Sequence, residues 1–295
     1  DRSYSGRSRR QRLADGIDLI VSSGTEPGRA LSLELDEDTT IYLPLSGDGP
    51  TPAADGLPRL WVLAPLAENL KSGWLLNGRN FRVDPGRGSL KRGEGEPERV
   101  FQRLGEKLGR KLVDLADLAV KDWADFALQA GLSDVSPETG PRTFWTRLAD
   151  LFVRDFDAEI AQHMHGQDRG YGHLVSQRPV LPTHLGGPFQ GLVIASDAKK
   201  TLQGHMAEPS MLTDIADWRA FDEIKLNCVG SRTSNILSKL DLSAPRPISL
   251  SEIIRKEIGP ENRITPALAG KLGRVLTDER LNKLSGNEEE ELNGV

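Results

Sequence analysis

Short runs rich in hydrophobic residues mark the first third of the chain as strand-like. They cover residues 17–21, 30–35 and 40–43, and in the second run three leucines alternate with serine and glutamate. Alternation with a period of two is typical of strands that have one buried face and one solvated face. A loop rich in glycine, proline and aspartate follows at residues 46–58. We therefore predict a sheet in this part of the chain.

The next segment, LWVLAPL at residues 60–66, is apolar throughout and has the length of a strand. Because Gly56 and Pro58 precede it and polar residues follow it, we expect a mostly buried strand rather than a helix. Pro65 lacks a backbone N–H and should mark the edge or the end of that strand. Residues 81–83 repeat the alternation on a smaller scale, and they should form a short half-buried strand.

From Pro97 onward the apolar residues recur at steps of three to five, which is typical of an amphipathic helix. Pro97 suits a first helical turn, and Gly131 suits a helix end. A second helical stripe runs from Phe144 to Ile160. A sheet followed by packed helices predicts an α+β fold with a mixed sheet.

The remainder of the chain carries signals for short, capped helices. A capping box lies at residues 249–252, and a threonine followed by proline suits another helix start at residues 265–266. We predict a basic arm or linker at residues 1–14, an α+β domain at residues 15–165, and a mainly helical module with short strands at residues 166–295. The two larger regions should be separate domains.

Composition narrows the classes of function. The chain has 295 residues, a formal net charge of −5 at pH 7 and a pI of about 5.7, so a general coat for nucleic acid is not expected. The single cysteine, Cys228, excludes an internal disulfide framework, and cytoplasm is the expected compartment. No apolar run approaches the roughly 18 to 20 residues of a membrane span. Because the chain begins with Asp1 and ends just after an acidic run, we expect a piece of a longer protein.

No complete active site is readable. The sequence has no GxxxxGK[ST] loop, no GxGxxG, no GxSxG and no kinase motif set. Four of the five histidines lie at residues 163–188, but no HExxH or similar spacing supports a metal site there. We expect these histidines to be ordinary polar or half-buried residues. Catalysis by this chain alone is therefore not predicted, and any ATPase activity would belong to a longer protein.

A basic loop follows the predicted central strand. Asp84-Pro85-Gly86-Arg87 should form a tight turn. The loop brings five cationic residues together within a short stretch: Arg79, Arg82, Arg87, Lys91 and Arg92. A solvated surface turn is one interpretation. A phosphate-facing loop is the other, because guanidinium groups and turn amides suit a polyphosphate.

The segment from residue 33 to residue 90 resembles the region that follows the ATP-binding domain in large bacterial proteins of the GHKL type, which have a nucleotide fold like that of sacsin and the ninety-kilodalton heat-shock chaperone. In that family a strand ending in LPL or LPT leads to a glycine-containing turn, an aromatic NGxF element and an arginine. The corresponding residues here are Ala64-Pro65-Leu66, Gly73-Trp74, Asn77-Gly78, Phe81 and Arg87. Pro182-Thr183 resembles a later proline-threonine element of the family.

The resemblance implies a transducer or middle domain that packs beside an ATP site. The acidic and asparagine-bearing helix and the DxGxG-type turn that hold Mg-ATP in the family are missing here, so ATP and Mg would be bound only through an upstream domain and not by this chain alone. Arg87 matches the family motif and is the candidate contact to the γ-phosphate. Lys91 and Arg82 are further candidates by proximity. A bacterial antiviral defence or chaperone-like assembly would be the setting.

Two other classes of function remain open from the sequence. The first is a non-catalytic scaffold or protein-interaction module, including self-association, which the serial helices favour. The second is a nucleic-acid-binding module of a defence or repair complex, which the arginines at residues 2–12 and 79–92 favour and the acidic balance disfavours. A salt titration of binding would separate these classes, since contacts to phosphate give a steep negative slope.

Overall fold

The chain divides into two compact units in a computed structural model, Asp1–Val180 and Leu181–Val295. Each unit is described by itself. The structure describes residues 7–23, 28–62, 64–66, 72–79, 81–86, 90, 96–153, 159–183, 191–200, 228–229, 237–240, 242, 266 and 269–270.

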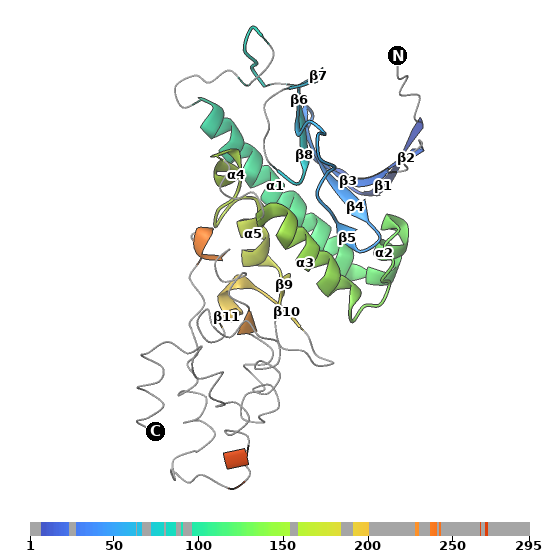
Figure 1. The fold of residues 1–295 in the computed structure, drawn as a ribbon, viewed down its shortest axis with the longest axis vertical. Coiled ribbons are helices and arrows are strands. Elements are labelled where there is room, and N and C mark those ends of the chain that lie inside the picture. The colour runs from blue at the N-terminus through green and yellow to red at the C-terminus, as the bar shows by residue number, and fades with distance from the viewer. Residues whose placement is uncertain are drawn as a thin grey trace. The chain divides into compact units, whose positions relative to one another are not determined.

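The first unit begins with an antiparallel meander in which each strand pairs with the next (Figure 1). Its four strands are β1 (Arg7–Ala14), β2 (Ile17–Ser23), β3 (Gly28–Asp36) and β4 (Thr39–Ser46). The predicted strands at residues 17–21, 30–35 and 40–43 are thereby confirmed. β1 lies in the region that we expected to be an arm or linker, and that expectation is wrong from Arg7 onward.

Four shorter strands complete the sheet: β5 (Gly49–Pro50), β6 (Leu60–Val62), β7 (Ala64–Pro65) and β8 (Leu75–Gly78). The order is β1-β2-β3-β4-β8-β6-β7, and β5 pairs with β4. β6 and β8 run parallel, whereas the other pairs are antiparallel, so the sheet is mixed. The α+β class with a mixed sheet is confirmed.

Residues 60–66 do not form one buried strand as predicted. They divide into β6 and β7, which pair with each other through Trp61 and Pro65 and through Val62 and Ala64. Leu60 and Leu66 at the two ends are buried, and the amide of Leu66 donates to the carbonyl of Leu60 at 2.9 Å. The chain therefore reverses and brings both end leucines into the core, while Ala64 and Pro65 are exposed at the edge. Pro65 does lie at the sheet edge, as expected.

The two faces of the meander differ in polarity. Leu31 and Leu33 on β3, with Ile41 and Leu43 on β4, are fully buried and share one face, which we call the helix-side face. The alternate residues form the outer face, where Tyr42 is half-buried. This alternation is the one that the sequence pattern predicted.

Helices follow the sheet. The long helix α1 (Glu96–Lys121) packs against β3 and against the later helices, and Figure 1 shows it running alongside the sheet. The other helices of the unit are α2 (Trp123–Ala130), α3 (Gly140–Val153), α4 (Glu159–Met164) and α5 (Gly170–Gln177). The helix predicted after Pro97 is confirmed as α1 and α2, and the one predicted from Phe144 is confirmed as far as Val153. Residues 154–158 lie outside the described residues, and Ile160 belongs to α4.

Helix ends follow ordinary capping chemistry. The Asp122 side chain accepts a hydrogen bond from the amide of Asp125 at 3.0 Å and so caps the start of α2. Gly131 ends α2 in the left-handed conformation with a φ of 69°, which glycine adopts without steric cost. The expected helix end at Gly131 is confirmed.

The glycines of α1 allow the α4–α5 segment to approach closely. A Cβ added at Gly105 would lie 2.4 Å from the carbonyl oxygen of Met164, and one at Gly109 would lie 2.8 Å from the Cβ of His173. Because α5 packs on α1 in this way, the first unit extends to Val180. The boundary that we expected at residue 165 falls before the end of this unit.

The second unit is described only in part. Short strand pairs join β9 (Leu181–Pro182) to β10 (Leu192–Val193), and β11 (Lys199–Lys200) to β12 (Cys228–Val229). A 3-10 turn, η1 (Ala195–Asp197), lies between β10 and β11. The predicted capping box at residues 249–252 lies outside the described residues, and of the helix predicted from residue 265 only residues 266, 269 and 270 are described, so the mainly helical module stays a prediction.

Candidate phosphate-contacting loop and other candidate sites

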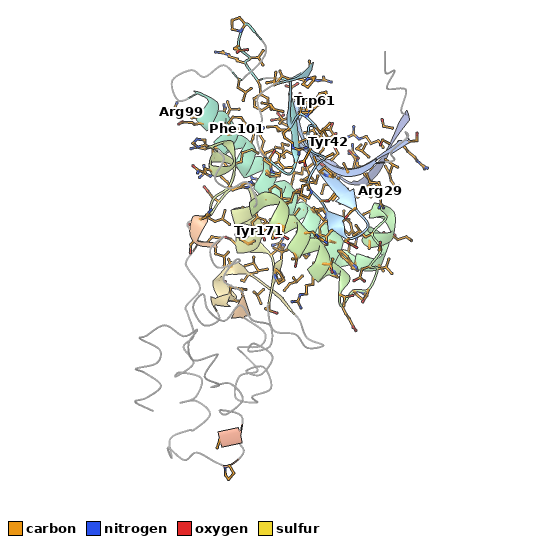
Figure 2. All side chains as sticks on the ribbon, viewed as in Figure 1. Arg29, Tyr42, Trp61, Arg99, Phe101 and Tyr171 are labelled. Atoms are coloured by element: carbon orange, nitrogen blue, oxygen red, sulfur yellow. The ribbon has the colours of Figure 1, made fainter. Side chains whose placement is uncertain are left out.

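The candidate loop starts where β8 ends. The amide of Arg79 donates to the carbonyl of Asp38 at 3.0 Å, which ties the end of β8 to the turn between β3 and β4. The ring of Phe81 then stacks on Phe101 of α1, with centroids 5.7 Å apart and an interplanar angle of 26°. Figure 2 labels Phe101 near the start of that helix. The segment before the loop is therefore fixed both to the sheet and to α1.

Glycine is required at the end of β8 by this packing. A Cβ added to Gly78 would lie 2.2 Å from Cε2 of Phe81. The two residues belong to the NGxF element noted in the sequence, Asn77-Gly78 followed by Phe81. The spacing of that element thus has a local structural reason, because the aromatic ring occupies the space where a larger residue at position 78 would place its side chain.

The base of the loop is closed by a β-bridge. Val83 and Leu90 form an isolated antiparallel bridge, and Leu90 is buried. Pro85 and Gly86 form a turn between them, as the sequence predicts. Val83 and Leu90, at the two ends of the loop, are therefore held together by backbone pairing.

The structure describes only one of the three predicted site residues. Arg82 is exposed. Residues 81–83 do not form the short strand that we predicted, and of the three only Val83 takes part in β pairing, in the bridge with Leu90. Arg87 and Lys91 lie outside the described residues, so whether the three cations come together stays a prediction.

A second cluster of charges was not predicted from the sequence. It comprises Arg10 and Arg12 on β1, Asp18 on β2 and Glu34 on β3, and we call it the edge cluster. Asp18 is fully buried and accepts hydrogen bonds from both arginines, from Nε of Arg10 at 2.7 Å and from Nε of Arg12 at 2.6 Å. Arg10 also bridges to Glu34. The two guanidinium groups neutralise a carboxylate that would otherwise be buried without a partner.

The signal for the edge cluster was present in the sequence. Asp18 interrupts the apolar run IDLIV, and a charged residue inside a strand needs a cationic partner when it is buried. Arg10 and Arg12 are also two residues apart, which places them on the same face of a strand. We nevertheless predicted an arm or linker at residues 1–14, because residues 1–12 are highly polar.

A buried polar cluster lies between α3 and α5. His165 is 2% exposed, and its Nδ1 accepts a hydrogen bond from the amide of Tyr171 at 3.1 Å. Burial, assisted by the charge of Arg169, lowers the pKa of His165 to about 3. The Phe152 ring contacts the His165 ring edge-on and stacks on the Tyr171 ring. A histidine held neutral in this way is a structural residue and not a proton-transfer group near neutral pH.

The hydroxyl of Tyr171 is buried in the same cluster. Burial raises its pKa, and the nearby charge of Asp150 raises it further. The phenol therefore stays protonated, and it cannot act as a base under ordinary conditions.

Ion pairs join α1 to its neighbours. Arg178 donates to both oxygens of Asp117, at 2.5 and 2.8 Å, and this pair lowers the pKa of Asp117. Lys107 bonds Asp36 at the end of β3 at 2.7 Å. Burial opposes ionisation of Asp36, but the hydrogen bonds from Lys107, Thr39 and the Asp38 amide lower its pKa overall.

The other two described histidines, His163 and His173, are half-buried. His184 and His205 lie outside the described residues. Within the described ranges, no three histidine, cysteine, aspartate or glutamate side chains are placed to hold a metal ion. We derive no step of nucleotide chemistry from the described part of the chain. Among the described helices, none is both long enough and apolar enough to span a membrane.

No family model, curated protein or solved structure matches the chain.

Proposed function

We propose that residues 15–165 act as the transducer portion of a larger GHKL-type ATPase, which couples ATP binding in an upstream domain to a change of conformation. Two lines of support converge on this proposal. The first is the resemblance of residues 33–90 to the region that follows the ATP-binding domain in that family. The second, which carries most weight, is that the candidate loop is anchored at its base by the Val83–Leu90 bridge and next to α1 by Phe81.

The role of the loop follows from the chemistry of arginine. A guanidinium group can bridge two phosphate oxygens, and it is ordered at a lower entropic cost when a constrained turn precedes it. Pro85 and Gly86 form such a turn directly before Arg87. Arg87 would contact the γ-phosphate held by the upstream domain, with Lys91 and Arg82 as further contacts. A positive charge there would stabilise charge that builds up on the transferred phosphate.

The route of coupling would run along α1. Phe81 contacts Phe101 in the second turn of α1, and the same helix packs against β3, α4 and α5. A displacement of the loop would therefore be transmitted to a rigid helix of 26 residues rather than to a flexible linker. We place this activity in the bacterial cytoplasm, in a defence or chaperone-like assembly.

The proposal is tested by substitution of Arg87 in the full-length polypeptide. Arg87→Ala should lower ATP turnover about 10- to 1000-fold, the range typical of one positioned donor, with nucleotide affinity nearly unchanged. Arg87→Lys should recover only part of the rate, because an ammonium group cannot bridge two oxygens in the same geometry. The measurement is single-turnover hydrolysis, and Arg110→Ala, on an exposed position of α1, is the matched control. Wild-type rates in both Arg87 variants would exclude Arg87 from the mechanism.

A second candidate function is a protein-interaction module without chemistry. The position of β1 at the end of the sheet supports it, because a strand there can pair with another chain. Self-association belongs to the same class. If Arg87 substitutions change neither turnover nor nucleotide affinity, this candidate becomes the preferred function.

Nucleic acid remains a partner class to be tested through the basic patches at residues 2–12 and 79–92. Within the first patch, Arg10 and Arg12 already bind the carboxylates of the edge cluster, and both side chains keep about half of their surface exposed. A binding constant for single-stranded or duplex DNA that falls steeply with salt concentration would support this class.

A further inference from the structure

β1 is the one long edge among the described strands of the sheet. It lies at one end of the strand order and pairs only with β2, whereas β7 at the other end has two residues (Figure 1). On the side away from β2, the backbone N–H and C=O groups of β1 therefore have no strand partner in the described part of the chain. Such an edge can accept an additional strand through main-chain hydrogen bonds.

The side chains of β1 present guanidinium groups on both faces of the strand. Arg9 is exposed and makes no hydrogen bond or ion pair with any described residue; by alternation it lies on the face opposite to Arg10 and Arg12. The side chains of Arg10 and Arg12 remain 50% and 55% exposed, although both bind Asp18. A guanidinium group carries five N–H donors, of which Arg12 uses Nε for Asp18, while Nη1 lies 3.7 Å from Oδ1 of Asp15.

We propose that the open edge of β1, from Arg7 to Arg12, binds an extended acidic segment of a partner protein, which adds to the sheet as a further strand. Carboxylates on either face of such a segment would meet guanidinium donors, and its backbone would pair with the free edge of β1. The register of β1 with β2 is regular from Arg7 to Arg12 and shifts between Arg12 and Ala14. This irregularity limits the docking length to about six residues, or roughly 20 Å.

The positive charge of β1 also disfavours pairing with the β1 strand of a second copy of the chain. Four of the residues from Arg7 to Arg12 are arginines, so antiparallel pairing of two β1 strands would place arginines opposite one another. Like charges that face each other across strands are destabilising. The arginines also disfavour pairing of β1 with neutral strands, because charged side chains on an edge strand oppose non-specific association. An acidic strand would instead be attracted to them.

The test uses three synthetic ten-residue peptides and the chain as it exists. The first peptide alternates glutamate with threonine and valine, the second has lysine in place of each glutamate, and the third keeps the glutamates but has proline at alternate positions. The proline peptide has the same charge but cannot donate the main-chain hydrogen bonds of a strand. Binding is followed by fluorescence anisotropy, and amide hydrogen exchange of Arg7–Ala14 is followed by NMR.

The glutamate peptide should bind, and the amides of β1 that point away from β2 should become protected from exchange. The lysine and proline peptides should bind at least about tenfold more weakly. Arg9→Glu should weaken binding of the glutamate peptide by about tenfold or more and strengthen binding of the lysine peptide, whereas Arg110→Glu on α1 should do neither. Equal binding of the proline peptide, no added protection in β1, or equal effects of the Arg9 and Arg110 variants would overturn the proposal. A glutamate peptide that fails to bind at millimolar concentration would assign the arginines to edge protection alone.

Discussion

His165 shows how the environment of one residue can set the pH dependence of stability. Its pKa is lowered from 6.5 to about 3 in the folded chain, chiefly by burial. Between these values the unfolded chain binds a proton that the folded chain does not, so the free energy of unfolding should decrease as the pH falls. From pH 7 to pH 5 the loss attributable to His165 should be about 2 kcal/mol. Urea unfolding of the chain at several pH values measures it.

His165→Asn is the matched variant for this prediction. The asparagine side chain can still accept the hydrogen bond from the Tyr171 amide, but it does not titrate. The variant should therefore show a flatter dependence of stability on pH between 5 and 7. An unchanged slope would mean that His165 is not the group responsible. Asp36 and Asp117, whose pKa values are lowered, should affect stability only at lower pH, since they lose their charge as the pH falls through those values.

The environments of some residues could be predicted from the sequence, and those of others could not. The buried leucines of β3 and the helix end at Gly131 follow from alternation and backbone preference, which are local properties. The burial of Asp18 does not, because it depends on two arginines that are brought to it by strand pairing. The environment of His165 likewise depends on α5 folding back over α1.

At the scale of elements, the packing of α1 depends on glycines that reduce its intrinsic helix propensity. Gly105→Ala would raise helix propensity by about 1 kcal/mol, but the new methyl group would lie 2.4 Å from the Met164 carbonyl oxygen. Overpacking of this kind costs about 1 to 3 kcal/mol, and here the neighbour is backbone and cannot rotate away. We expect a net loss of stability in thermal unfolding.

Glu106→Ala is the control for the effect of alanine on the same helix. Glu106 is exposed on the neighbouring position of α1, so its replacement should leave the free energy of unfolding within about 0.5 kcal/mol of wild type. A Gly105→Ala variant as stable as Glu106→Ala would show that the α4 end is not in close contact with α1.

Helices and strands were predictable where the repeating pattern of apolar residues extends over many residues. Strands β2, β3 and β4 and helix α1 extend over several alternations or turns, which gives a clear signal. Residues 60–66 were not predictable as two strands, because an apolar run does not show where the chain reverses. β1 was missed because polar strands at a sheet edge lack the apolar alternation that identifies a strand.

At the scale of the whole molecule, the end of the first unit can be tested by truncation. A chain that ends at Val180 retains α5 and its contacts with α1, including the Asp117–Arg178 ion pair. It should unfold cooperatively, with a melting temperature close to that of the first unit in the full chain. A chain that ends at residue 165 should be markedly less stable, since it lacks α5 and exposes the surface of α1 around Gly109. Equal melting temperatures would restore the boundary at 165.

The candidate loop illustrates the limit of what sequence shows about a site. The turn at Pro85-Gly86 was predicted from its residues, but its anchoring was not. The Val83–Leu90 bridge and the Phe81–Phe101 contact join segments that only the folded chain brings together. The proposed function depends on this anchoring more than on the number of cations in the loop.

The most direct test of the transducer proposal is amide hydrogen exchange of the full-length polypeptide with a non-hydrolysable ATP analogue and with ADP. Exchange should differ between the two states at the base of the loop and in the first turns of α1, residues 81–104, because these segments are joined by the Phe81–Phe101 contact. The amides of β1 and β2, at the far edge of the sheet, should exchange equally in both states. Identical exchange across residues 81–104 in the two nucleotide states would contradict the account.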